Sequence, residues 1–135
     1  MPAQPTLSPA EAKTALIDLN QELNRLQRAI RLAIQEQLSK MVGRSFGELS
    51  QNRQFADSIH QLLDSHGLRV RCLECGHPAI LRVSPRGKGS GVFVFDHTIE
   101  GKRTFHGGRR TVPIIHLVAK PPRKRNQNLT KNATG

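Results

Sequence analysis

The chain has 135 residues, which is enough for one compact domain or two small ones but not for two domains of ordinary size. Aromatic residues make up only 4% of it and all are Phe, so the burial of large rings cannot be the main source of stability. The sequence has neither the run of about 20 apolar residues that a membrane helix needs nor a secretory signal, so we expect an intracellular, cytoplasmic protein without membrane contact.

The whole chain has a net charge of +11, and most of this positive charge lies in its second half. Residues 1–67 carry seven basic and seven acidic side chains, whereas residues 68–125 carry thirteen basic side chains against Glu74, Asp96 and Glu100. A neutral half joined to a half of net charge +10 predicts that one part assembles and the other contacts a polyanion.

The first predicted element is a long helix that follows a flexible N-terminus at residues 1–8. Ser8 and Glu11 have the spacing of a capping box with Pro9 in the first turn, and Gly43 is the expected stop. Apolar residues recur in alternating steps of four and three, the heptad spacing of a coiled coil. The members of this seam are Ala12, Leu16, Leu19, Leu23, Leu26, Ile30 and Ala33.

A second, shorter helix is predicted to end at Gly67, so that residues 9–66 form an αα-hairpin. Ser45 and Glu48 repeat the capping-box spacing. The expected apolar side consists of Phe55, Ile59, Leu62 and Leu63. At about 1.5 Å per residue the helices would span about 50 Å and about 30 Å, which leaves part of the first seam uncovered. We expect a homodimer there, with packing inside the chain or a helical partner protein as alternatives.

The pattern changes at residues 67–120, where short β-rich runs alternate with glycine-rich turns. The runs are residues 79–83, 91–98, 103–106 and 112–119. They predict a small antiparallel sheet, in which Pro113 should lie at an edge or at the start of its strand. Residues 121–135 are predicted to be a disordered basic tail. The expected fold class is α+β, with a helical hairpin followed by a basic, zinc-binding β domain.

The only two cysteines, Cys72 and Cys75, occur in the sequence CLECG. This arrangement resembles the knuckle of zinc ribbons and related zinc folds, in which a tight turn containing a permissive glycine directs two thiolates toward one ion. The resemblance covers about six residues and implies half of a tetrahedral zinc site.

Two histidines are predicted to complete the site through a β-hairpin. If Gly101 and Lys102 form a two-residue type II′ turn, His97 lies opposite His106 on one face of the sheet. We therefore predict that Cys72, Cys75, His97 and His106 bind Zn²⁺. His77 and His116 remain alternative ligands, although His116 lies in an apolar run that is more typical of a core histidine.

Other interpretations of the cysteines are a thioredoxin-like redox pair, two core thiols or a catalytic zinc site. The redox interpretation requires the C-x-x-C at the start of a helix, and here it leads into a β-rich run. A catalytic zinc needs an open coordination position and a nearby base, and Asp96 should point away from His97. The pattern favours a structural metal in a protein that is not an enzyme.

Clustered Lys and Arg among glycines favour contacts with phosphates. The predicted contact residues are Arg86, Lys88, Lys102, Arg103, Arg109 and Arg110. Base stacking would depend on Phe93, Phe95 or Phe105, which are expected in the core, so we predict contacts dominated by the phosphate backbone. The expected function is nucleic-acid binding, with DNA and RNA not distinguished and a nucleoid or nuclear location if the partner is DNA. A protein-interaction adaptor and a metal-dependent hydrolase are the alternatives.

Overall fold

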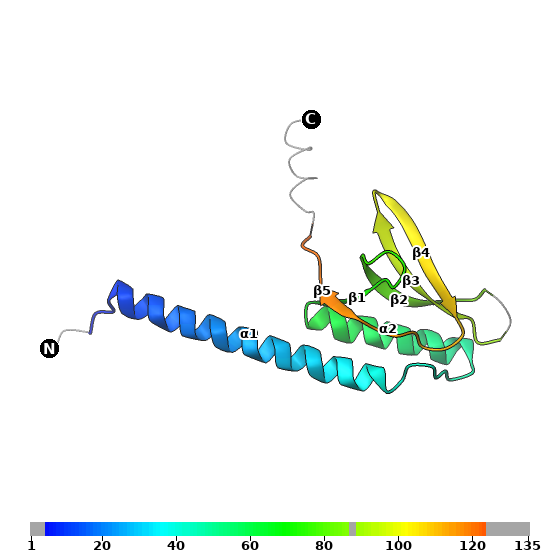
Figure 1. The fold of residues 1–135 in the computed structure, drawn as a ribbon, viewed down its shortest axis with the longest axis horizontal. Helices are drawn as coiled ribbons and strands as arrows, with labels where there is room; N and C mark the ends of the chain where they lie inside the picture. Colours follow the sequence, from blue (N-terminus) through cyan, green and yellow to red (C-terminus); the bar gives the residue numbers. More distant parts are fainter. Residues whose placement is uncertain (1–4, 87–88, 124–135) are drawn as a thin grey trace, which may run out of the picture. The chain divides into compact units, whose positions relative to one another are not determined.

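The computed structural model describes residues 5–86 and 89–123. It contains two helices and one five-stranded antiparallel sheet, which confirms the α+β class. The chain divides into two compact units, Met1–Leu38 and Ser39–Gly135. The second unit holds both the sheet and α2, a helix that the sequence analysis grouped with the first one (Figure 1). Most of the predicted tail, from residue 124 onward, and residues 1–4 lie outside the described residues.

Helix α1, Pro9–Ser39, begins at the predicted capping box. The Glu11 backbone N–H donates to Ser8 Oγ at 3.1 Å, and the Ser8 N–H donates to Glu11 Oε2 at 3.4 Å. The helix ends at Ser39, four residues before the expected stop at Gly43. The central residues of the seam are exposed, from 65% at Leu16 to 39% at Ile30. The hairpin and the coiled-coil pairing stay predictions.

Helix α2, Leu49–Ser65, begins without the predicted capping box. Glu48 rather than Ser45 is the N-cap residue, and it makes no side-chain cap. Ser45 Oγ accepts hydrogen bonds from Gly47 N and Asn52 Nδ2 instead. The buried side of the helix consists of Asn52, Ala56, Ile59 and Leu63. Leu62, expected on this side, is 44% exposed.

The sheet has the strand order β4-β3-β2-β1-β5, and every neighbouring pair is antiparallel. The strands are β1 Leu68–Arg71, β2 Pro78–Ser84, β3 Val92–Ile99, β4 Lys102–Arg109 and β5 Leu117–Ala119. Strand β1 was not predicted. Only the end of the run 112–119 is a strand. At its start, Val112 instead pairs with the segment before α2 through backbone bonds to Gly43 and Arg44. Pro113 is buried in this irregular segment.

Side chains along β2 and β3 alternate between two faces of the sheet. The helix face, which packs on α2, includes Ala79, Leu81, Val83, Phe93 and Phe95, all of them buried. The open face includes Arg82, Ser84, Val94 and Asp96 from β2 and β3, together with Arg103 and Phe105 from β4. One face therefore forms the core of the second unit, while the other carries charged and polar groups interspersed with apolar ones such as Ile80 and Val92.

An ion-pair cluster joins α2 to the far edge of the sheet. The Asp64 carboxylate lies 2.8 Å from Arg69 Nη1 on β1 and 2.7 Å from Lys120 Nζ, directly after β5. Hydrogen bonds from Lys120 and Arg69 lower the pKa of Asp64 to about 2. The Asp64 carboxylate is therefore ionised at neutral pH.

Candidate metal centre and basic surface

The two cysteines lie on a tight turn that connects β1 to β2. The Gly76 N–H donates to the Cys72 carbonyl at 2.9 Å, and the Cys72 N–H donates to the His77 carbonyl at 2.9 Å. Gly76 has the positive φ of 77° that the knuckle resemblance implies. Cys72 is buried and Cys75 is partly buried. The turn thus holds both thiols on one side of the chain.

The histidines come from the β3–β4 hairpin, whose predicted turn is wrong. Ile99 pairs with Lys102, so the central turn residues are Glu100 and Gly101, with φ values of 50° and 79°. Two positive φ values are typical of a type I′ turn, whose twist matches that of the strands. His97 consequently lies opposite Thr104 rather than His106.

Both histidines nevertheless share the helix face. His106 lies opposite Phe95, two residues from His97 along β3, and residues two apart on a strand point to the same side. The imidazole rings are 5.0 Å apart between centroids. The predicted and observed turns differ by a two-residue shift in partner, which preserves the face and explains why the histidine pair could be predicted despite the wrong register.

Four potential ligand atoms converge where the cysteine turn meets the hairpin. Cys75 Sγ lies 2.9 Å from His97 Nε2, and Cys72 Sγ lies 3.3 Å from His106 Nδ1. All four atoms lie within 4.8 Å of one another. Tetrahedral bonds of about 2.0–2.3 Å place ligand atoms roughly 3.3–3.8 Å apart. The four residues could therefore bind one metal ion after small adjustments.

Neighbouring backbone and carboxylate groups hold the histidines in place. His97 Nδ1 donates to the Thr104 carbonyl at 2.8 Å, which leaves Nε2 with its lone pair facing Cys75. Glu74 Oε2 accepts from the Gly107 N–H at 3.0 Å and lies 3.8 Å from His106 Nδ1. These supports were not predicted, because a carbonyl has no sequence signal and Glu74 is distant from β4 in the chain.

The other two histidines considered as ligands do not join this cluster. His77 is exposed, with its ring centroid 6.3 Å from that of His97. His116 is also exposed, so its expected place in the core is wrong. It lies just before β5, at the opposite edge of the sheet from β4. Burial raises the pKa of the Cys72 thiol, so a metal ion or another cation is needed to hold it as a thiolate at neutral pH.

The predicted phosphate-contacting residues follow β4, an edge strand of the sheet. Lys102 and Arg109 lie at the two ends of this strand, about 23 Å apart at about 3.3 Å per residue. Arg110 follows directly, and Arg86 is close enough that a Cβ on Gly108 would lie 3.8 Å from its Nη2. Four of the predicted residues are exposed and form no ion pair within residues 5–86 and 89–123, namely Arg86, Lys102, Arg109 and Arg110. Lys88 lies outside the described residues.

Arg103 differs from the other predicted contact residues because it shares a carboxylate. Its Nη2 and Arg82 Nε lie 2.9 Å and 2.6 Å from Asp96 Oδ2. Burial alone raises the pKa of Asp96, but the hydrogen bonds and charges of Arg103 and Arg82 outweigh it and lower the pKa. Asp96 therefore serves as the anionic centre of an arginine pair on the open face. The role of Arg82 was not predicted.

Comparison with known protein families, curated protein sequences and solved structures finds no match for this chain. Within the described part of the chain, no helix combines the length and the apolar character needed to cross a membrane.

Proposed function

We propose that this chain is a small, zinc-stabilised nucleic-acid-binding protein without enzymatic activity. The observation that carries the proposal is the row of exposed cations along and beside β4, an edge strand that has no acidic residue. Phosphates neutralised by such cations release condensed counterions, which gives affinity without base-specific contacts. The row reaches over a length that several successive phosphates would occupy.

Zinc is the proposed metal because the donor set is two thiols and two imidazoles. This combination at tetrahedral spacing is typical of structural zinc sites, and four protein ligands leave no open position for substrate or water. The ion would join the β1–β2 turn to the β3–β4 hairpin, so it would position the basic edge strand. Asp96 faces the opposite side of the sheet with two arginines, which argues against its use as a catalytic base.

The binding test is fluorescence anisotropy with labelled nucleic acid over a range of about 50 to 200 mM salt. We expect the log of the binding constant to fall linearly with the log of salt concentration. Replacing Arg109→Glu together with Arg110→Glu should weaken binding at least tenfold and reduce the salt slope by about 2. The matched control is Arg44→Glu with Arg53→Glu, which makes the same change in net charge at exposed positions before and within α2.

Equal losses in the two double variants would show that net charge alone drives binding, and would remove β4 from the interface. Absence of salt-sensitive binding in the unmodified chain would reject the proposed function. Salt-sensitive binding to an acidic protein but not to nucleic acid would favour the adaptor alternative instead.

The exposed seam of α1 supports a second element of the proposal, self-association through a coiled coil. Leu16, Leu23 and Ile30 alternate with Leu19 and Leu26 at heptad spacing, and all five are at least 39% exposed. A continuous apolar seam of this kind is covered when an identical helix packs against it. Light scattering after size exclusion should give a dimer, and Leu19→Glu with Leu26→Glu should give a monomer. A monomeric unmodified chain would refute this element without affecting the binding proposal.

A further inference from the structure

The open face of the sheet carries an exposed aromatic ring. Phe93 and Phe95 are buried as expected, but Phe105 is 48% exposed. Phe105 lies on β4 opposite Asp96 of β3, and the Arg103 guanidinium carbon lies 5.1 Å from the centroid of its ring. The guanidinium is fixed in turn by Asp96 at 3.1 and 2.9 Å. The ring is therefore supported by an arginine from its own strand while half of its surface faces solvent.

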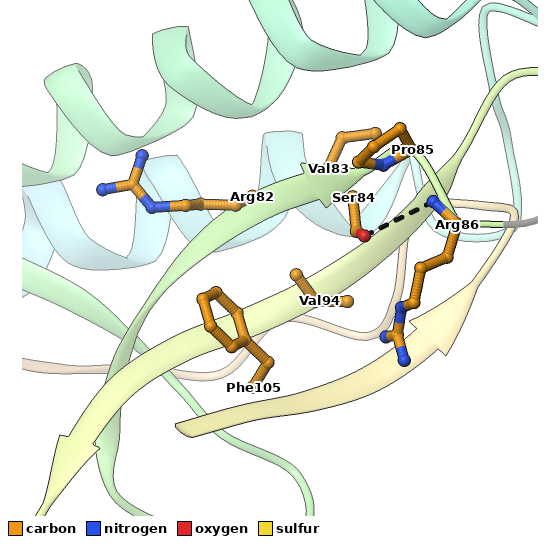
Figure 2. Close-up of a pocket in the computed structure, with 7 residues that line it drawn as sticks. All are labelled: Arg82, Val83, Ser84, Pro85, Arg86, Val94 and Phe105. Atoms are coloured by element: carbon orange, nitrogen blue, oxygen red, sulfur yellow. Dashed lines mark hydrogen bonds between the residues drawn. The ribbon is translucent and has the colours of Figure 1, made fainter. Parts of the chain in front are cut away.

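A hollow of about 410 Å³ adjoins this ring, a volume within the roughly 300–1,000 Å³ range of ligand pockets. Figure 2 shows Val94 between Phe105 at one end and Arg86 at the other. The lining residues are Arg82, Val83, Ser84, Pro85, Arg86, Val94 and Phe105. Phe105 is the only ring system with a π face among these lining residues, and the polar part of the lining consists of a serine and two arginines.

Positive charge dominates the surroundings of the hollow. No acidic residue lines it, and the Arg86 side chain has no ion-pair partner in the described part of the chain. Arg82 and Arg103 share the single carboxylate of Asp96, with 40% and 63% of their side chains exposed. Three arginines against one aspartate leave a net positive charge around an apolar ring.

We infer that the hollow beside Phe105 binds an unpaired base of single-stranded nucleic acid. This inference rests on the proposed function and specifies the form of its ligand. An unpaired base has a flat face that can stack on Phe105, and the phosphates next to it would contact Arg86 and the exposed arginines of the open face. A base inside a duplex is already stacked on its neighbours, so it cannot use the ring. The structure thus predicts a preference for single strands that phosphate contacts alone would not give.

The binding test compares single-stranded and duplex 20-mers with the full-length chain by fluorescence anisotropy. Phe105→Leu should reduce single-strand affinity by about 5- to 100-fold, the usual effect of removing one stacking ring, and should change duplex affinity less than twofold. Phe46→Leu is the matched control, because Phe46 is 56% exposed but contacts another ring, that of Phe55 at 5.4 Å. It should change neither affinity.

A tryptophan at this position provides a direct measurement of stacking, because the chain has no Trp or Tyr. Phe105→Trp should retain the single-strand affinity, and its fluorescence should be quenched when the oligonucleotide binds. Phe46→Trp should remain unquenched under the same conditions. This pair also covers the case in which Phe105→Leu fails to fold, since the larger ring fills the same exposed position.

The possible results separate the stacking inference from the proposed function. If Phe105→Leu binds single strands as the unmodified chain does, while Arg109→Glu with Arg110→Glu still weakens binding, the inference is wrong and the proposed function stands. Equal loss of single-strand and duplex affinity in Phe105→Leu would also overturn the inference. Quenching of Phe105→Trp by polyglutamate as strong as by the oligonucleotide would assign the face to an acidic protein. No binding to any nucleic acid would reject both.

Discussion

Gly91 lies where the β2–β3 connection closely approaches α2. Its replacement by alanine should destabilise the second unit strongly. Its φ is +75°, and an added Cβ would lie 2.5 Å from the Ser84 carbonyl oxygen and 2.8 Å from Leu49 Cδ1. A positive φ costs a residue with a side chain about 1–2 kcal/mol, and overpacking adds about 1–3 kcal/mol. Alanine also restricts the unfolded chain more than glycine does, which offsets about 0.4–1 kcal/mol of this loss. We expect a net loss of about 2–4 kcal/mol.

Gly47 provides a control that isolates the steric part of this loss. Its φ is also +75°, but a Cβ there would meet nothing within 4 Å. Gly47→Ala should therefore cost only about 1 kcal/mol, the backbone term less the gain from the unfolded chain. The free energies of unfolding can be measured by urea titration with circular dichroism, since the chain has no Trp or Tyr for fluorescence. Equal losses at the two positions would refute the close approach of this connection to α2.

Three further predictions concern buried and paired polar groups. Asn52 is fully buried and bonds to backbone groups of Phe46 and Ser90, so Asn52→Ala should lower the free energy of unfolding by about 2–4 kcal/mol in urea titrations, and a loss below about 1 kcal/mol would contradict these bonds. The pKa of Asp64 is lowered from 3.8 to about 2, so its ion pairs stabilise the fold above pH 3.8 and lose this effect as the pH falls through about 2. The unmodified chain should therefore have a higher Tm than Asp64→Asn at neutral pH, and the difference should disappear in acid. A difference in Tm that does not depend on pH would refute this prediction. Asp96→Asn removes a negative charge beside two arginines, so it should strengthen nucleic-acid binding with a steeper salt dependence. Weaker binding would show that the loss of a fixed Arg103 beside Phe105 outweighs the gain in positive charge.

Much of the secondary structure could be predicted from local patterns. The capping box at Ser8 marks the start of α1, and alternating apolar residues mark β2 and β3. Strand β1 was missed because its four residues, LRVR, contain only two apolar positions next to a cysteine turn. The capping box at Ser45 does not form because Asn52, within α2, and the Gly47 backbone N–H both donate to the Ser45 hydroxyl.

The metal cluster could be predicted because its parts have short-range signals. The C-x-x-C-G spacing brings the thiols together, and a two-residue turn near Gly101 keeps both histidines on one face in either register. The turn type itself could not be chosen, because Gly101 suits a central position of several turns and Glu100 adopts an uncommon positive φ of 50°. The exposure of Phe105 was not predictable either, because it depends on which face of the sheet α2 covers.

The measurement that tests the central claim most directly is the zinc content per chain of protein purified without added metal. We predict about one zinc per unmodified chain, and its loss in Cys72→Ser, His97→Ala and His106→Ala. His116→Ala is the control and should keep the metal, since that histidine is exposed and outside the cluster. A folded unmodified chain without zinc, or equal metal content in all four variants, would contradict a zinc site at these residues.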